Sequence, residues 1–225
     1  MIEENVKNIL NEIPQTNPFG ERVTLVAAVK TQTPEDINRA IQAGITDIGD
    51  NHVQEFKDKY EQIVGNPTRH FIGHLQTNKV KYLIGKVDLY HSLDRFDLAE
   101  ELSKRSARAG ITSSVLVQIN IRNEQTKSGF DVSQTQEVCK TVNEMEGLKV
   151  VGLMAMLPDS DDVVLLESFA KSMREEFDLL KYTLPDVKYL SMGMSGDWKL
   201  CVECGSNMIR LGTAIFGKRY YPPKA

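Results

Sequence analysis

Short apolar runs alternate with amphipathic stretches along most of the chain. The apolar runs are rich in Val, Ile and Leu and contain little polar alternation, which is typical of strands buried on both faces. Eight of these runs predict strands, at residues 25–30, 46–50, 69–73, 88–93, 113–121, 149–156, 187–193 and 208–217.

Helical periodicity fills the gaps between these runs. Thr33 offers an N-cap before Pro34, and Gly44 ends the pattern that follows. Further apolar stripes predict helices within residues 94–110, 138–147 and 166–180. Before all of them, an apolar stripe predicts a leading helix that could cover one end of a barrel, carried by Val6, Ile9, Leu10 and Ile13.

Strand and helix alternate eight times without a large break. This order predicts an α/β fold, a single (β/α)8 TIM-type barrel with an extra N-terminal helix, rather than a doubly wound sheet. Because the chain contains no linker, low-complexity segment or short repeat, we expect one domain over residues 1–225. In such barrels the loops that follow the carboxyl ends of the strands build the active site.

Composition narrows the classes of partner. No apolar run approaches the roughly 20 residues of a membrane span, and the acidic N-terminus does not resemble a secretory signal. Three cysteines do not make a disulfide framework, so we expect a cytoplasmic protein. A net charge of −4 without a dense basic cluster argues against nucleic acid.

Lys30 ends the first predicted strand, after five apolar residues. A lysine among apolar side chains loses solvation of its ammonium, so its pKa falls and a nucleophilic amine becomes available for a carbonyl. The alternative is an ordinary strand-end lysine, with its stem on the core and its ammonium in water. Local sequence alone leaves both interpretations open.

Two glycine-containing segments, at residues 193–196 and 210–213, accompany the last two predicted strands. Barrels of this kind often bind a phosphate there, on backbone N–H groups and the start of a short helix. Ser195 and Thr213 supply hydroxyl donors, and Arg210 supplies a charged fork. The alternative is glycine used for packing and serine used as an N-cap.

Other motifs do not make a site. The Cys201 and Cys204 spacing falls within a predicted helix, and His70 and His74 lack a third ligand, so we expect no metal. Residues 193–197 lack the second glycine of a hydrolase nucleophile elbow. The sequence contains neither a Walker loop nor a dinucleotide fingerprint.

Several segments together resemble the pyridoxal phosphate homeostasis protein family, which is similar to the N-terminal barrel domain of alanine racemase. The resemblance runs in family order from about Leu25 to Gly217. It is carried by AAVKTQTPEDI, DIGDNHVQE, RHFIGHLQTNK, VLVQINI followed by KSGF, GLMAM, LSMGMS and MIRLGTAIFG. The resemblance implies pyridoxal 5′-phosphate (PLP) as cofactor and a role in vitamin B6 homeostasis, with an indirect effect on amino-acid and keto-acid balance.

The resemblance also implies roles for individual residues. Lys30 matches the lysine that forms a Schiff base with the cofactor, and Asn51 matches an asparagine near the ring. Arg210 matches an arginine at the same site, with a phosphate contact favoured over a ring-nitrogen contact. The remaining matches line the pocket beside the ring, at Met156 and Met192, or cradle the phosphate, at Ser195, Gly212 and Thr213.

Alanine racemase has a second domain that supplies a tyrosine for proton transfer, whereas this chain ends soon after Gly217. With Lys30 on one face of the ring we therefore expect the other face to be open, which suits a carrier that hands PLP to apoenzymes rather than a turnover enzyme. The absence of an exposed apolar stripe favours a monomer. The alternatives are a small PLP-dependent racemase or lyase, and a phosphate-binding barrel enzyme that uses Lys30 on a sugar. The sequence contains no positive feature of a protein-binding module.

Overall fold

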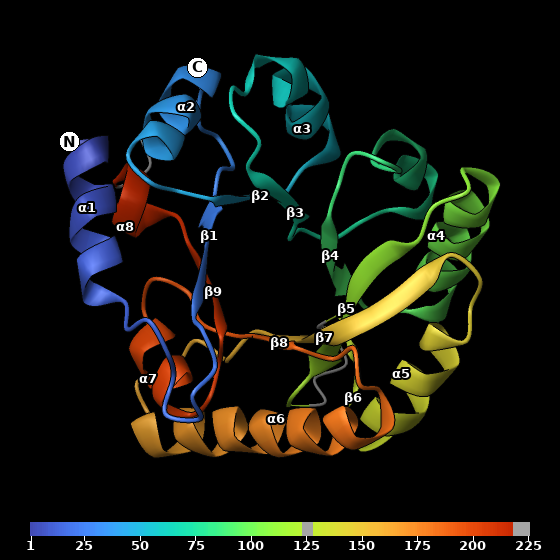
Figure 1. The fold of residues 1–225 in the computed structure, drawn as a ribbon. Coiled ribbons are helices and arrows are strands. Elements are labelled where there is room, and N and C mark those ends of the chain that lie inside the picture. Colours follow the sequence, from blue (N-terminus) through green and yellow to red (C-terminus); the bar gives the residue numbers. More distant parts are fainter. Residues whose placement is uncertain (123–127, 218–225) are drawn as a thin grey trace, which may run out of the picture.

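The fold is a closed barrel of eight parallel strands surrounded by helices (Figure 1), as seen in a computed structural model that describes residues 1–122 and 128–217. Neighbouring strands pair in chain order, and the pairs β4–β5 and β1–β9 complete the circle. The predicted barrel is therefore confirmed. Its strands are β1 (Thr24–Ala28), β2 (Asp47–Asp50), β3 (Thr68–Phe71), β4 (Leu89–Leu93), β5 (Ser113–Asn120), β7 (Leu148–Ala155), β8 (Tyr189–Ser191) and β9 (Met208–Leu211).

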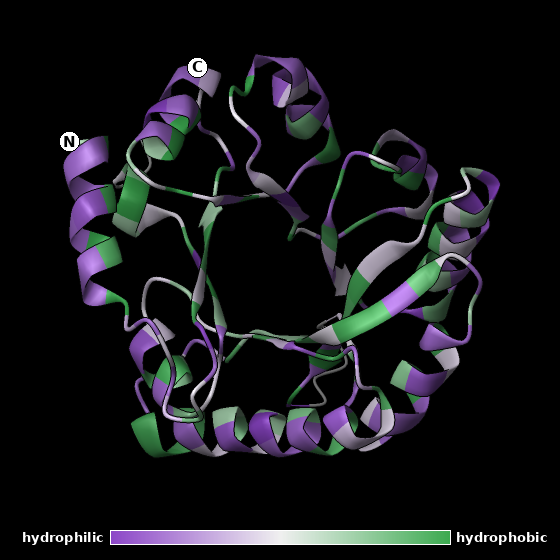
Figure 2. Ribbon diagram, viewed as in Figure 1, coloured by the Kyte–Doolittle hydropathy of each residue, from purple (hydrophilic) through white to green (hydrophobic). Residues whose placement is uncertain are grey.

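The helices form an outer ring and carry hydrophilic residues on the sides that face away from the barrel (Figure 2). They are α1 (Ile2–Glu12), α2 (Pro34–Gln42), α3 (Val53–Lys59), α4 (Phe96–Arg108), α5 (Thr135–Asn143), α6 (Val163–Thr183), α7 (Trp198–Glu203) and α8 (Thr213–Phe216). Short 3-10 turns add η1 (Tyr60–Gln62), η2 (Thr77–Tyr82) and η3 (Val132–Gln134). No helix in the described ranges is long and apolar enough to cross a membrane.

The start of α2 shows how local sequence fixes an element. Thr33 Oγ1 accepts a hydrogen bond from the Asp36 N–H at 3.2 Å, and Pro34 occupies the first helical position. Both features were expected from the sequence, because a capping hydroxyl and a preset φ favour helix initiation. Gly44 follows the helix with φ of +120°, a conformation that L side chains rarely adopt.

The prediction of one continuous strand over residues 208–217 is wrong. β9 ends at Leu211, Gly212 turns the chain, and α8 begins at Thr213. The apolar residues after the turn leave the barrel and join the cluster between barrel and helices, which contains both Ile215 and Val6. The apolar run continues across a strand-to-helix junction, because the strand is buried in the barrel and the helix is buried against the outer ring. Hydropathy alone therefore does not indicate the junction.

The leading helix forms, but it does not cover an end of the barrel. α1 lies in the outer ring beside α2 and α8 (Figure 1), because its buried residues Ile2, Val6 and Ile9 pack into the same cluster as α8. A further strand that the sequence did not predict, β6 (Phe130–Asp131), pairs with the end of β5. It is too short to produce a recognisable pattern.

Apolar side chains fill the barrel in one central cluster made of Val26, Leu89, Leu116, Val151, Met154 and Met208. Two larger clusters lie between the strands and the helices. Polar side chains also point into the barrel, among them the buried His70, His91 and Arg210. A buried polar group is costly unless it is hydrogen-bonded, so these three side chains need hydrogen-bond partners inside the barrel.

Candidate functional site

The predicted site residues gather at the carboxyl ends of the strands. Asn51 directly follows β2, Met156 directly follows β7 and Gly212 directly follows β9, while Lys30 lies two residues after β1. Since all strands of the barrel are parallel, these positions share one end of it. The fold thus brings these residues to one end of the barrel, and their contact with a ligand stays a prediction.

Two hydroxyl groups from different strand ends are bonded to each other. Thr213 Oγ1 donates to Ser195 Oγ at 2.8 Å, and both residues are exposed. Thr213 is the first residue of α8, so it stands where backbone N–H groups of a helix lack intrahelical partners. The pair and these N–H groups provide donors of the kind that a phosphate accepts.

Asn51 brings a buried acceptor to this end. Its Oδ1 is buried and has no hydrogen-bond partner among the described residues. An unsatisfied buried acceptor costs about 1 to 3 kcal/mol, and a donor from a bound ligand would satisfy it. The residue therefore fits a position against a small polar molecule.

Lys30 is half-buried, and the backbone around it is held by residues of α3 that the sequence did not single out. Lys59 Nζ donates to the Val29 carbonyl at 3.1 Å, and the Thr31 N–H donates to Glu55 Oε2 at 2.8 Å. Thr31 itself has φ of +64°. Glu55 and Lys59 reach this backbone only through packing between segments that are distant in sequence. The spacing of residues along the chain therefore does not indicate their contacts.

Asp50 lies next to this group, buried at the end of β2. Its Oδ1 has no hydrogen-bond partner in the described part of the chain, and it lies 4.0 Å from Lys59 Nζ. Burial raises the pKa of Asp50 to about 6, since the lysine is too distant to offset the lost solvation. This carboxylate therefore titrates unusually close to neutrality.

Arg210 is buried inside the barrel, against the ends of β7 and β8. Its Nη1 donates to Ser191 Oγ at 2.5 Å and to the Ser191 carbonyl at 3.0 Å, and its Nη2 donates to the Ala155 carbonyl at 3.1 Å. Burial lowers the pKa of Arg210 to about 10, which still leaves the guanidinium charged at neutral pH. The residue supplies a fixed positive charge within the barrel.

A chain of hydrogen bonds continues from Arg210 through the barrel to Asp47. Ser191 Oγ lies 3.2 Å from His91 Nδ1, His91 Nε2 lies 2.9 Å from His70 Nδ1, and His70 Nε2 lies 3.0 Å from Asp47 Oδ1. With both imidazoles neutral, every bond can donate in one direction, from the guanidinium to the carboxylate. The charge of Arg210 is thus linked to a distant counter-charge, which helps to explain its burial.

The two predicted pocket methionines differ in position. Met156 is 49% exposed, whereas Met192 is fully buried in the core cluster that also contains Met173 and Cys201. Met192 is therefore not grouped with the exposed hydroxyl pair, and its contact with a cofactor stays a prediction. Within the described ranges, no group of three or more His, Cys, Asp or Glu side chains could hold a metal ion.

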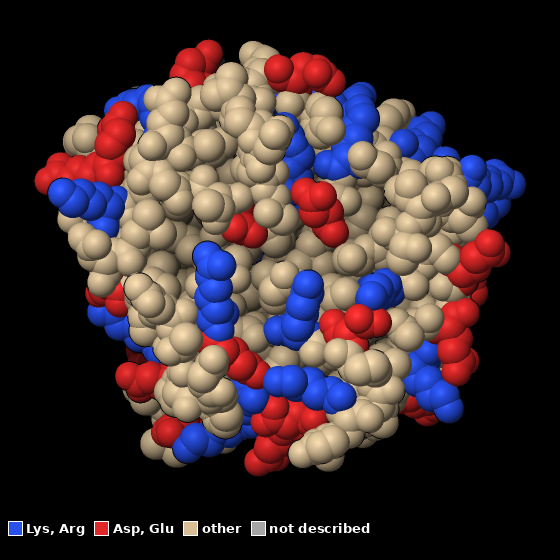
Figure 3. All heavy atoms as spheres, viewed as in Figure 1, with Lys and Arg blue, Asp and Glu red and all other residues tan. Residues whose placement is uncertain are grey.

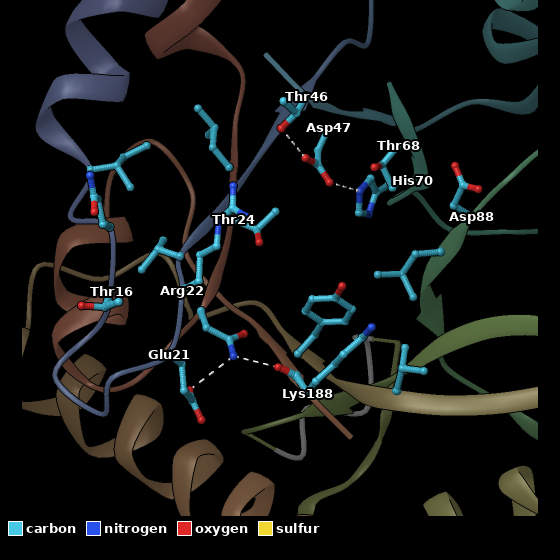
Figure 4. A pocket seen from close by; sticks show the side chains of 18 of the residues that line it. Thr16, Glu21, Arg22, Thr24, Thr46, Asp47, Thr68, His70, Asp88 and Lys188 are labelled. Carbon is cyan, nitrogen blue, oxygen red and sulfur yellow. Dashed lines mark hydrogen bonds and ion pairs between the residues drawn. The ribbon is translucent and has the colours of Figure 1, made fainter. Parts of the chain in front are cut away.

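A large hollow lies at the opposite end, where the strands begin. Its volume is about 1250 Å³, and residues along its lining include Arg22, Asp47, Asp88 and Lys188. Figure 3 shows basic and acidic side chains around a hollow on this face, and Figure 4 shows His70 reaching Asp47 at its wall. In barrel enzymes the catalytic groups lie at the carboxyl ends of the strands, so this hollow is at the end of the barrel opposite the candidate site.

Comparison with known proteins gives consistent results. Residues 2–220 match the family model described as alanine racemase, N-terminal domain. The pyridoxal phosphate homeostasis protein of Aquifex aeolicus is 40% identical over 200 residues, which is 88% of this chain and 87% of that one. The protein of the same name from Pasteurella multocida is 38% identical over 229 residues, 98% of each chain.

Solved structures extend the similarity. The structure of PipY of Synechococcus elongatus PCC7942 with PLP bound has a TM-score of 0.84 and 27% identity, covering 96% of this chain and 100% of that one. Alanine racemase of Clostridium difficile has a TM-score of 0.76 at 16% identity, covering 98% of this chain and 57% of that one. The second likeness concerns the fold alone.

Proposed function

Because this chain belongs to the alanine racemase N-terminal domain family, and within it to the pyridoxal phosphate homeostasis proteins, we propose that it binds pyridoxal 5′-phosphate and takes part in its homeostasis. The observation that carries the proposal is the shared barrel end of Lys30 and the bonded pair Ser195–Thr213. A lysine side chain and hydroxyl donors at one end of the barrel suit a ligand that has an aldehyde and a phosphate.

In this proposal Lys30 holds the cofactor covalently, as a Schiff base with its aldehyde. The phosphate is near a dianion at neutral pH, so the hydroxyls of Ser195 and Thr213, with the N–H groups at Gly212 and after it, would bind it. Asn51 Oδ1 would gain the donor that it lacks. Each of these residues supplies what the ligand chemistry requires.

Arg210 contributes a buried positive charge from inside the barrel. Its hydrogen bonds to β7 and β8 fix the guanidinium, so little side-chain entropy is lost when a ligand binds. A phosphate oxygen or the ring nitrogen of the cofactor can each accept from it. Substitution by Lys would remove the planar fork and keep only a point charge.

We propose a carrier rather than a turnover enzyme, because the relatives that share most of the chain are named as homeostasis proteins. A racemase needs a group that can act as base or acid on each face of the substrate carbon, or one group that serves both faces. The carrier would act in the cytoplasm and pass the cofactor to PLP-dependent apoenzymes. Exchange of the α-hydrogen of an amino acid in deuterated solvent would instead favour a small racemase or lyase.

The test is an absorption spectrum of the purified protein mixed with PLP, before and after borohydride. We expect a yellow band that disappears on reduction and a phosphopyridoxyl mass on the Lys30 peptide. Lys30→Ala should abolish the band and weaken binding by at least about tenfold, with residual affinity through the phosphate. Lys57→Ala, on the exposed part of α3, is the control and should behave like the wild type.

Two outcomes would contradict the proposal. A saturated wild-type protein without a band or an adduct would leave the phosphate-binding barrel enzyme as the better interpretation. An undiminished band in Lys30→Ala would move the covalent attachment to another lysine.

A further inference from the structure

Both peptide groups of Lys30 are bonded to the same pair of side chains on α3. Lys59 Nζ donates at 3.1 Å to the Val29 carbonyl, which belongs to the peptide group before Lys30. Glu55 Oε2 accepts at 2.8 Å from the Thr31 N–H, which belongs to the peptide group after it. Glu55 Oε2 also accepts from Lys59 Nζ at 3.1 Å, so one ion pair holds both sides.

These bonds begin where the sheet stops holding the chain. The last residue of β1 paired with β2 is Ala28, opposite Gly49, and the Val29 N–H still donates to the Gly49 carbonyl at 3.0 Å. Beyond that point the described bonds to the peptide groups of Lys30 are one turn bond, from the Gln32 N–H to the Val29 carbonyl at 3.2 Å, and the two bonds to α3. The ion pair therefore extends the rigid part of the barrel by one residue, to Lys30 itself.

The ion pair is protected from water on the lysine side. Lys59 is 8% exposed, and its side chain also lies near the buried Asp50. A buried ammonium is costly unless it is paired and fully bonded, and here the carbonyl of Val29 and the carboxylate of Glu55 provide those bonds. An ion pair at the surface would not need these additional bonds, because water would solvate its ammonium.

The backbone conformation of Thr31 adds a second observation. Its φ of +64° lies in the left-handed region, which a β-branched residue rarely adopts and which costs of the order of 1 to 3 kcal/mol. Such a conformation persists where surrounding contacts impose it, and the Glu55 bond to the Thr31 N–H is such a contact. Strain at the residue beside the expected covalent attachment indicates that the direction of this backbone matters.

We propose that Glu55 and Lys59 are positioning residues for Lys30, which fix its peptide groups so that its amine meets the cofactor aldehyde in one orientation. The inference rests on the proposed function and goes beyond it, by assigning the orientation of the lysine to a pair that does not touch the cofactor. Because a misplacement of about 1 Å can slow a reaction about 100-fold, even modest loosening should be measurable.

The experiment separates covalent attachment from non-covalent binding. Stopped-flow absorbance gives the rate at which the imine band forms with PLP, and competition with pyridoxine 5′-phosphate, which lacks the aldehyde, gives the affinity for phosphate and ring. We expect Lys59→Met and Glu55→Gln to form the band about 10- to 100-fold more slowly, with the affinity for the analogue unchanged. Lys59→Arg should recover part of the rate, because it can keep both bonds.

Lys57→Met is the matched control, since Lys57 is on the same helix and lies over the ring of Tyr82, 4.5 Å from its centroid. It should form the band at the wild-type rate. If Lys59→Met does not fold, Glu55→Gln tests the inference alone, because it keeps the side-chain volume and removes the charge. The same two quantities are measured, the rate of imine formation and the affinity for the analogue.

Wild-type rates in Glu55→Gln and in any folded Lys59→Met would overturn the inference, and so would an equal loss of rate and analogue affinity, which indicates a general structural role. Failure of the proposed function is distinguishable from both, because the wild-type protein itself would then show no band.

Discussion

Asp50 gives a prediction at the scale of a single residue. Its buried carboxylate has a pKa of about 6, raised from 3.8 by burial. The folded protein therefore binds this proton more tightly than the unfolded chain, and the contribution of Asp50 to stability falls as pH rises from about 4 to about 6. The difference corresponds to about 3 kcal/mol, so Asp50→Asn should gain about this much relative to the wild type at pH 7 and little at pH 4.

Urea denaturation of the cofactor-free protein between pH 4 and pH 8 measures this difference. Asp186→Asn is a suitable control, because Asp186 is exposed and pairs with Lys149 at the surface. Its difference from the wild type should be small throughout. Wild-type and Asp50→Asn curves that run parallel across this range would show that Asp50 is not titrating there.

Individual site residues differ in how far the sequence reveals them. Lys30 and Asn51 could be located because each stands at the end of an apolar run, which marks the mouth of the barrel, whereas Gly212 lies within the predicted run at residues 208–217. The positions of Lys59 and His91 in the sequence do not indicate their contacts. Their partners, Val29 and Ser191, are far away in sequence, and only the packed barrel brings each pair together.

At the scale of the element, the end of β3 supports the site through one glycine. A Cβ at Gly73 would lie 2.0 Å from the backbone oxygen of Asn51, too close for any adjustment short of moving backbone. We expect Gly73→Ala to displace Asn51, to lower the free energy of unfolding by about 1 to 3 kcal/mol and to weaken PLP binding.

The control for this substitution is Gly196→Ala, since a Cβ there has no neighbour within 4 Å. Its free energy of unfolding should change by less than about 0.5 kcal/mol. Chemical denaturation gives the stability, and titration of the imine band gives the affinity. A Gly73→Ala protein with wild-type stability would mean that the strand ends can separate without cost.

Helices and strands could be predicted from the sequence where all residues of an element are buried in the same way. They were harder to predict where one element passes directly into the next. The strands β1 to β5 are buried on both faces, so their runs stand out from the polar helices around them. The run at residues 208–217 misled because its second half is equally apolar, yet packs outside the barrel on α1. Hydropathy indicates that a residue is buried, but it does not indicate on which side of the sheet the residue is buried.

At the scale of the whole molecule, the two ends of the barrel differ in the groups that they carry. The strand starts surround a hollow of about 1250 Å³ with charges of both signs, and the strand ends carry Lys30 and the hydroxyl pair. Alternation of strands and helices in the sequence predicted which end would carry chemistry. It could not predict the hollow, because an open space depends on how side chains from eight strands meet rather than on any one segment.

All the proposed cofactor contacts come from one chain, so the whole molecule does not need a second copy to complete the site. Its exposed apolar side chains on α6 also lie far apart, with Val163 and Val164 at one end of the helix and Leu179 and Tyr182 toward the other. At about 1.5 Å per residue, these groups are separated by more than 20 Å and do not form one patch of the kind that holds dimers together. We therefore predict a monomer with a mass near 25.3 kDa by light scattering, with and without PLP, over a tenfold range of concentration. A mass that doubles with concentration would contradict this, and a mass that doubles only when PLP is added would point to a cofactor site shared between two chains.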